Sequence, residues 1–524
     1  MTEKLFWITA TTEMKTTLLY NGKILTGQRY SPGAVLIEGD RIAGVYFTSA
    51  EENGCIRTDG AIREEGCIRD DTEESPGSEA GKTPDGTVTE EDRLRKDIEA
   101  VRMWLDRADV KTDVKGKTIM AGGIDAHVHF REPGMCSKAD MESESKAALL
   151  GGITSFIDMP NTKPAAVTME LIEEKAALAA GRVYANYGFN IGASNDNLEE
   201  LARATEQYAD RFGGIKVFMG SSTGNMLVDS DKTLEGIFAI KGKPVLVHCE
   251  DESIIRENTV KAMEEYGDDI PFALHPEIRS RKACIKSSAK ALELAIRYGT
   301  ALHLLHVSTA EELAMATAAK LHNPHVTVET SANYLWFCDR DYSTLGSRIK
   351  CNPAIKSADD RDALRAGLKA GTVDTVGSDH APHLATEKDR DYIHAPSGIP
   401  SIQHSLQVLL TVAAQEDIPL TRIAAAFSEK TAEIFHIQDR GYLKEGNFAD
   451  IVIVDTDAEI TATGEGLLYR CGWSPYEGYR LKGPVDTVFV NGETVVSDGM
   501  ITGNPAGQRL VFKRLNSKRT ADNI

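Results

Sequence analysis

Two histidines in the stretch Asp-Ala-His-Val-His-Phe-Arg-Glu-Pro-Gly, His127 and His129, constrain this chain more than any other feature. Side chains at positions i and i+2 of a β-strand project from the same face, so both imidazoles point to one place while Val128 points away. Neutral imidazole is a good zinc ligand, and two ring nitrogens can hold one ion at about 2.0–2.1 Å. The pair therefore predicts a metal site at the end of a short buried strand. A histidine pair on a solvent-exposed strand gives the same pattern, so the rest of the chain must decide.

Length and composition exclude several classes of protein. The chain has 524 residues, 41% of them hydrophobic, which is enough for one large domain and a smaller one. No stretch approaches the roughly 20 apolar residues of a membrane span, and the N-terminus lacks the apolar core of a signal peptide. The eight cysteines are scattered and indicate reduced thiols, so we expect a cytoplasmic protein. A net charge of −20 argues against a nucleic-acid partner, but local cations in a cleft can still bind a small anion.

An acidic segment interrupts the first part of the chain. Residues 51–110 contain 18 Asp and Glu against 9 Lys and Arg. Residues 70–79 have the composition of a disordered loop, whereas Leu94, Ile98, Val101 and Leu105 recur at helical spacing. We therefore expect residues 51–111 to form a surface insertion, a loop followed by a helix.

Eight short apolar runs alternate with helical stretches between residues 112 and 440. The runs are 124–130, 154–159, 184–191, 214–219, 244–248, 301–307, 326–330 and 375–378. Stretches rich in Ala and Glu, such as 169–180 and 359–370, are typical of the helices between them. Eight strands separated by helices predict an α/β fold, a (β/α)8 TIM-like barrel.

The two ends of the chain have a different pattern. Short apolar runs at 18–20, 34–38 and 42–46 precede the barrel, and runs at 451–454 and 487–490 follow it. Asn21-Gly22 and Asn491-Gly492 read as turns between strands. Residues 1–50 and 441–524 are therefore predicted to form one small β-sandwich domain built from both chain ends. Met14 is an alternative start, because the 13 residues before it carry no recognisable element.

Polar side chains stand at the C-terminal ends of the predicted strands, where the active sites of such barrels lie. Beyond the histidine pair they are Lys216, His248, His303, His306 and Asp379. Lys216 lies between Ile215 and Val217, where burying an ammonium is costly unless it is neutralised or paired. His303 and His306 are three residues apart, so only one of them can enter the barrel. Any one of these histidines alone is more often a core residue, but together the donors predict a two-zinc site.

These motifs resemble those of the cyclic amidohydrolases of the amidohydrolase superfamily and, among them, the dihydroorotase family. The resemblance covers about residues 16–50 and 112–500. It implies two zinc ions bridged by carbamylated Lys216, and a homo-oligomer. The implied metal ligands are His127, His129, Lys216, His248, His306 and Asp379. His306 is preferred to His303 because His-Val-Ser is the family's pattern at that strand, and Asp379 is implied to be the catalytic proton shuttle as well.

Arg131 separates the possible substrates, because a guanidinium presents a rigid fork of donors that matches a carboxylate. The substrates that the resemblance implies, N-carbamoyl-L-aspartate and L-dihydroorotate, carry a carboxylate beside the reacting ring. Asn161, Asn352 and His383 match the family's other substrate-contact positions. We therefore expect the zinc-dependent, reversible cyclisation of N-carbamoyl-L-aspartate to L-dihydroorotate and water in de novo pyrimidine synthesis.

Other functions stay open. Metal ligands alone do not separate dihydroorotases from allantoinases or from hydantoinases and dihydropyrimidinases, and the glycine-rich residues 219–224 look more like the hydantoinases. Strand seven continues from Glu329 without the histidines that dihydroorotases often have there. A non-catalytic scaffold with the same fold is a remote alternative, since all six ligand positions are filled.

Overall fold

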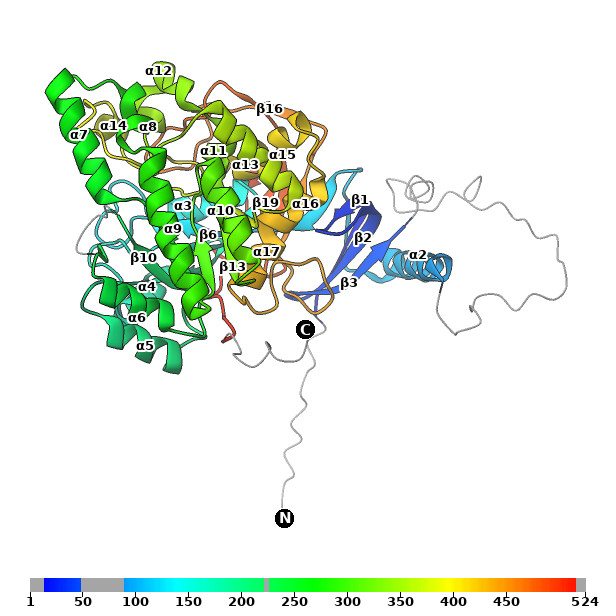
Figure 1. The fold of residues 1–524 in the computed structure, drawn as a ribbon. Coiled ribbons are helices and arrows are strands. Elements are labelled where there is room, and N and C mark those ends of the chain that lie inside the picture. The colour runs from blue at the N-terminus through cyan, green and yellow to red at the C-terminus, as the bar shows by residue number, and fades with distance from the viewer. Residues whose placement is uncertain (1–13, 49–88, 221–225, 515–524) are drawn as a thin grey trace, which may run out of the picture.

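A computed structural model describes residues 14–48, 89–220 and 226–514 (Figure 1). The acidic loop expected around residues 70–79 and most of the glycine-rich stretch after Met219 lie outside these residues. None of the helices in the described ranges combines the length and apolar character that a membrane crossing needs. The six cysteines in these ranges are all free thiols.

Parallel strands form the (β/α)8 barrel that the sequence predicted. They are β6 (Gly123–Val128), β7 (Ile153–Asp158), β8 (Asn186–Phe189) with its continuation β9 (Ile191–Gly192), β10 (Ile215–Phe218), β11 (Val245–His248), β12 (Leu302–Leu304), β13 (Val326–Ser331) and β14 (Thr375–Gly377). The barrel closes beside the histidine pair, where Val128 pairs with His380 and the His129 amide donates to the His380 carbonyl over 2.8 Å. The first and last strands therefore present their C-terminal ends to the same space.

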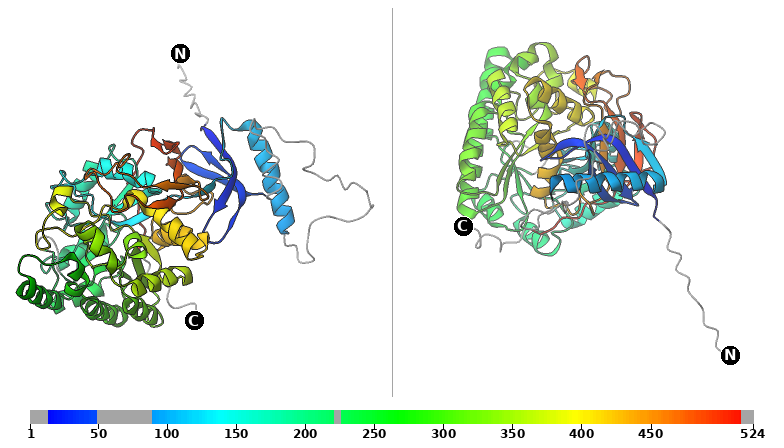
Figure 2. Two further views of the ribbon diagram at one scale, coloured as in Figure 1. Left: turned by 90° about the horizontal axis from the view of Figure 1, so that it is seen from above. Right: turned by 90° about the vertical axis from the view of Figure 1, so that its right-hand side faces the viewer.

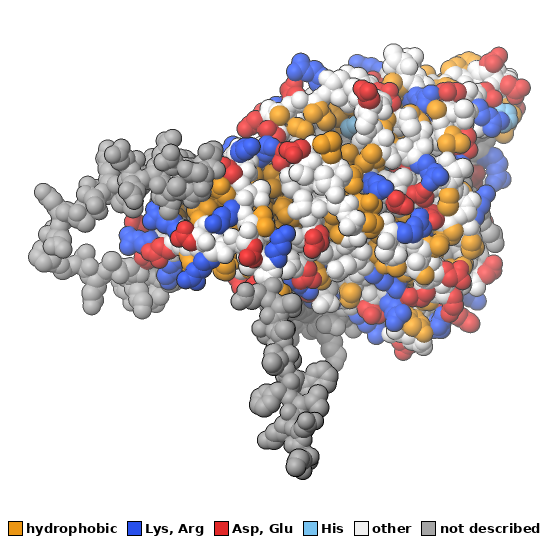
Figure 3. Space-filling view, turned by 180° about the vertical axis from the view of Figure 1, so that it is seen from behind, with side chains coloured by type: hydrophobic (Ala, Val, Ile, Leu, Met, Phe, Trp, Pro, Cys, Tyr) orange, Lys and Arg blue, Asp and Glu red, His pale blue; other side chains and the backbone are white. Residues whose placement is uncertain are grey.

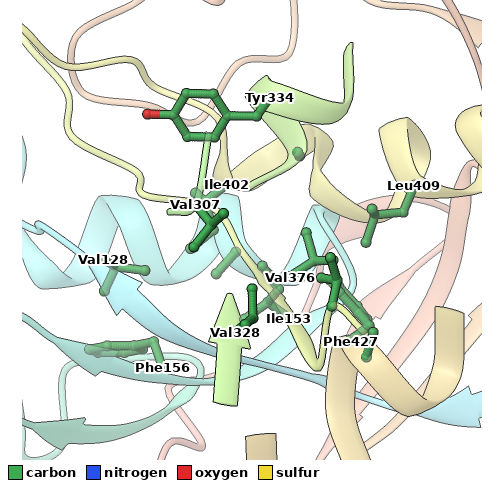
Figure 4. Close-up of a cluster of buried hydrophobic side chains, with 14 of the residues drawn as sticks. Val128, Ile153, Phe156, Val307, Val328, Tyr334, Val376, Ile402, Leu409 and Phe427 are labelled. Carbon is green, nitrogen blue, oxygen red and sulfur yellow. The ribbon is translucent and has the colours of Figure 1, made fainter. Parts of the chain in front are cut away.

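The helices surround these strands. The longer ones are α3 (Met141–Leu150), α4 (Met169–Ala179), α5 (Leu198–Gln207), α6 (Asp231–Ala239), α7 (Glu252–Tyr266), α9 (Arg281–Tyr298), α10 (Ala310–Lys320), α13 (Ala358–Ala370) and α15 (Ser405–Gln415). The shorter ones are α8 (His275–Ile278), α11 (Ala332–Trp336), α12 (Tyr342–Leu345), α14 (Ala385–Lys388), α16 (Leu420–Ala424) and α17 (Lys430–Ile434). Asp, Ser or Thr caps most of the longer helices by accepting a hydrogen bond from the first turn, as in Asp140 before α3 and Ser357 before α13. Apolar side chains from strands and helices fill the space between them (Figure 4).

A nine-stranded sheet takes strands from both ends of the chain, as predicted. It contains β1 (Thr16–Leu25), β2 (Tyr30–Glu38), β3 (Arg41–Phe47), β4 (Val110–Asp113), β5 (Thr118–Ala121), β15 (Ile451–Val454), β18 (Val485–Val490), β19 (Glu493–Ser497) and β20 (Met500–Ile501). A separate pair, β16 (Glu459–Thr461) and β17 (Arg480–Lys482), follows β15 in the chain. The predicted division of the chain at residues 51, 112 and 441 stays a prediction. β5 falls within the range predicted for the barrel, residues 112–440, but it is a strand of this sheet.

The two Asn-Gly pairs have different roles in the sheet. Asn491-Gly492 forms the predicted turn between β18 and β19, with both residues at positive φ. Asn21-Gly22 is instead a bulge inside β1, where the register with β2 shifts, and the hairpin turn comes later, at residues 26–29. The expectation of a turn at Asn21 was wrong. Asn21 has a positive φ of 56°, and an Asn in this conformation suits a β-bulge as well as a turn.

The helix expected at the end of the acidic segment is α2 (Glu90–Arg107). Its buried Val101 and Leu105 pack against Leu18 and Leu36 of the sheet. The sheet therefore lies between α2 and the barrel (Figures 1 and 2). Charged side chains of both signs are interspersed over the face seen in Figure 3.

A buried cluster of polar side chains around Asp450 joins the sheet to the barrel. Asp450 leads into β15, and its carboxylate accepts hydrogen bonds from Arg440 and from Asn186 of the barrel strand β8. Its other oxygen accepts from the Asn491 amide over 2.9 Å. Removing one partner of a buried pair leaves the other charge uncompensated, so this position is sensitive to substitution.

We expect Asp450→Ala to lower the free energy of unfolding by about 3–5 kcal/mol, because Arg440 then keeps a buried charge without a partner. Chemical denaturation measures this loss. The matched control is Glu257→Ala, which removes an exposed ion pair with Lys261 and should change stability by less than about 1 kcal/mol. Equal effects of the two substitutions would contradict the role given to Asp450.

Candidate active site

The ten residues predicted for the site line one cavity of about 760 Å³ at the C-terminal ends of the barrel strands. They are His127, His129, Arg131, Asn161, Lys216, His248, His306, Asn352, Asp379 and His383. The structure thus brings together side chains from strands β6, β10 and β11, from the loops after β6, β7, β12 and β14, and from the segment between β13 and α13. His303 is directed elsewhere: its Nδ1 lies 2.8 Å from Thr327 Oγ1 and its ring packs on Phe435.

His127, His129 and Asp379 converge on one point. Each histidine places its Nε2 3.3 Å from Asp379 Oδ1. Burial lowers the pKa of His129 to about 4, so this ring is neutral near pH 7.

The outer nitrogens of the two rings decide which atoms face the cavity. His127 Nδ1 donates to Glu329 Oε1 over 2.7 Å, and His129 Nδ1 donates to Asn161 Oδ1 over 2.7 Å. In neutral rings both Nε2 atoms then carry lone pairs, which face each other and the Asp379 oxygen. Three electron-pair donors meet with no proton between them, and this arrangement fits a bound cation.

His248 and His306 bring a second pair of ring nitrogens close together in the same cavity. His248 Nε2 donates to Glu250 Oε2 over 2.9 Å, and Glu250 is itself paired with Arg279. The free lone pair of His248 Nδ1 therefore faces His306 Nε2 at 2.9 Å. Burial lowers the pKa of both rings, so both are neutral. Within the described chain His306 Nδ1 is buried without a hydrogen-bond partner.

Lys216 lies between the two histidine pairs in the chain and lines the same cavity. Its side chain is 1% exposed, and its ammonium has no hydrogen-bond acceptor among the described residues. Burial lowers its pKa to about 8, which makes the neutral, nucleophilic amine accessible near neutral pH. Four imidazoles, one carboxylate and one deprotonatable amine make up a donor set that fits a metal centre with two ions.

The other end of the cavity is cationic. Arg131 is 6% exposed, and burial lowers its pKa to about 10. Its Nε donates to the Pro382 carbonyl over 3.1 Å and its Nη2 lies 3.0 Å from His383 Nε2, but no described carboxylate forms an ion pair with it. Asn352 Oδ1 is also buried there without a hydrogen-bond partner in the described chain. The cavity therefore offers a metal site at one end and an anion site at the other.

Three residues of this site were not identified from the sequence. Glu329 and Glu250 each hold the outer nitrogen of a histidine, and Lys138 contacts His383. The position of Glu250, two residues after His248 at a strand end, was a usable signal. Glu329 and Lys138 act through partners 202 and 245 residues away in the chain, and no local pattern indicates such contacts.

Comparisons with known proteins show the family and the fold of this chain. The amidohydrolase family matches residues 118–495. A dihydroorotase from Methanosarcina acetivorans is 32% identical over 408 residues, covering 76% of this chain and 86% of that protein. An allantoinase from Deinococcus radiodurans is 33% identical over 405 residues, covering 76% of this chain and 89% of that protein. The solved structure of an L-hydantoinase from Arthrobacter aurescens has a TM-score of 0.79 at 24% identity, covering 95% of this chain and all of that one, and it shows the same fold.

Glu329→Ala should reduce metal affinity by about 10–100-fold, because His127 loses the acceptor that fixes its orientation and tautomer. Titration of the metal-free protein with zinc measures the change. Glu311→Ala is the matched control, since Glu311 is a glutamate of the outer helix α10. Unchanged zinc affinity in Glu329→Ala would show that His127 needs no such support.

Proposed function

This chain belongs to the amidohydrolase family, and from that premise we propose that it is a dihydroorotase. The family and the relatives make it a metal-dependent hydrolase that acts on cyclic amides. The finer assignment is the reversible conversion of N-carbamoyl-L-aspartate to L-dihydroorotate and water. It has to be distinguished from allantoin hydrolysis, because allantoinases match the chain about as well as dihydroorotases do.

The buried guanidinium of Arg131 is the observation that supports a carboxylate substrate. A buried charge without a counter-ion is costly, and in this protein of net charge −20 no described carboxylate pairs with it. Its fork of donors is matched to a carboxylate. Dihydroorotate carries that group beside the ring, whereas allantoin and dihydrouracil do not.

We assign His127, His129, Lys216, His248, His306 and Asp379 to two zinc ions. Nitrogen and carboxylate ligands suit zinc, and carbamylation of Lys216, a buried amine without a hydrogen-bond acceptor among the described residues, would supply a further anionic oxygen ligand. Bound zinc would lower the pKa of a water molecule and polarise the ring carbonyl, which these side chains cannot do alone. The homo-oligomer implied by the resemblance stays a prediction.

The protein's own residues carry the proton and hold the substrate. In the hydrolytic direction a water oxygen bonds to the ring amide carbon and the bond from that carbon to the ring nitrogen breaks. The Asp379 carboxylate takes the water proton and delivers it to the departing nitrogen. Arg131 and His383 hold the substrate carboxylate, while Asn161 and Asn352 orient the ring so that one carbonyl faces the metal ligands. Cyclisation is the same sequence in reverse.

A side-by-side assay of dihydroorotate, allantoin and dihydrouracil tests the assignment. We expect kcat/KM for dihydroorotate to exceed the other two by at least about 100-fold, because only dihydroorotate provides the counter-ion of Arg131. Arg131→Ala should cost at least about 100-fold with dihydroorotate and leave residual turnover of dihydrouracil little changed. A wild-type preference for allantoin would replace the proposed function with allantoinase.

Asp379→Asn should lower kcat by at least about 100-fold, because the amide keeps an oxygen near His127 and His129 but cannot carry the proton. Steady-state kinetics give the loss, and elemental analysis of the same sample shows how much metal remains. Near-normal turnover in this variant would remove Asp379 from the proton transfer.

A further inference from the structure

Lys138 belongs to the loop after β6 and has no part in the mechanism described above. Its side chain lines the cavity beside Arg131. The ammonium lies 2.8 Å from Glu387 Oε1 and 3.0 Å from His383 Nδ1. Lys138 and Glu387 form an ion pair, and an ammonium can only donate hydrogen bonds.

This contact fixes which nitrogen of His383 carries the proton. Because Lys138 donates to His383 Nδ1, that nitrogen must present a lone pair, and in the neutral ring the proton is then on Nε2. The Nε2 proton has an acceptor in the structure, the Ser397 carbonyl at 3.1 Å. His383 stays neutral, since burial and then the charges on Arg131, Lys138 and Lys388 lower its pKa.

The proton on His383 Nε2 prevents Arg131 from donating a hydrogen bond to this nitrogen. Arg131 Nη2 lies 3.0 Å from His383 Nε2, so two N–H donors face each other and no hydrogen bond forms between them. The imidazole N–H has the Ser397 carbonyl as its acceptor, whereas the Nη2 group of Arg131 has no acceptor among the described residues. A carboxylate of the ligand can provide that acceptor for the guanidinium.

The opposite tautomer of His383 would give Arg131 a hydrogen-bond acceptor within the protein. With the proton on Nδ1, His383 could donate towards Glu387, whose Oε2 is 3.7 Å away, and its Nε2 lone pair would accept from Arg131. The guanidinium would then be satisfied inside the protein, and a ligand carboxylate would have to displace that hydrogen bond.

We propose that Lys138 is a positioning residue that fixes the tautomer of His383 and so keeps Arg131 available for a substrate carboxylate. This role rests on the proposed function, because it requires an anionic ligand. It places a specificity determinant outside the metal ligands and outside the residues that touch the ring.

The test compares the metal-loaded wild type with Lys138→Met and with Lys138→Arg, which keeps a cationic donor. The probes are orotate and uracil, two planar rings that differ by the carboxylate, with binding measured by calorimetry. We expect Lys138→Met to bind orotate at least 10-fold more weakly and uracil unchanged, and Lys138→Arg to stay within 3-fold of wild type for both. In kinetics with dihydroorotate, KM should rise at least 10-fold in Lys138→Met while kcat and metal content stay within 2-fold.

A double-mutant cycle with His383→Ala separates positioning from direct contact. If Lys138 acts through His383, adding Lys138→Met to His383→Ala changes orotate affinity by less than 2-fold. A further 10-fold loss in that background would show that Lys138 binds the ligand itself and would overturn the proposal. So would an unchanged orotate affinity in Lys138→Met, provided that the wild type prefers orotate to uracil. A wild type without that preference contradicts the proposed function itself, and this role with it.

Discussion

The site depends on hydrogen bonds made at the outer nitrogens of its histidines. Glu329, Asn161 and Glu250 each accept a hydrogen bond from a ring whose other nitrogen faces the cavity. This fixes the tautomers, and neutral rings then turn their lone pairs towards Asp379 or towards another ring. Between His127, His129 and Asp379 no proton relieves the repulsion between the lone pairs, so a cation would stabilise this cluster. The barrel supplies the required rigidity, because every ring is carried on a buried strand or directly after one.

The same pairing of donors with acceptors extends to the cationic part of the cavity. Arg131 follows His129 by two residues, so one loop carries both a proposed metal ligand and the cation that lines the same cavity. Beside His127, His129 and Asp379 acceptors converge, and a cation fits there. The Arg131 guanidinium has no carboxylate partner among the described residues, and an anion fits there. The proposed substrate, a ring with a carboxylate beside the scissile amide, matches this distribution of charge.

Much of this could be predicted from the sequence, and the remainder depends on contacts between distant residues. Eight apolar runs and their spacing were enough for the barrel. Strand-end polarity was enough for the six candidate metal ligands that line the cavity, whereas Asn161, Asn352 and His383 were added from the family resemblance. These features are local, because strand periodicity places side chains on a known face. The tie from Glu329 to His127 and the contact of Lys138 with His383 connect segments that only the closed barrel brings together. The bulge at Asn21 shows the limit within a single strand, since one dipeptide suits both a turn and a bulge.

Anomalous diffraction at the zinc edge from crystals of the native protein tests the central claim most directly, because it locates the cations instead of counting them. The geometry predicts two peaks in the cavity, one beside His127 and His129 and the other beside His248 and His306, with Asp379 and Lys216 close to both. A single peak would leave one pair of converging histidines without its cation. No peak within the cavity, in protein prepared without chelators, would contradict the assignment of these side chains to metal.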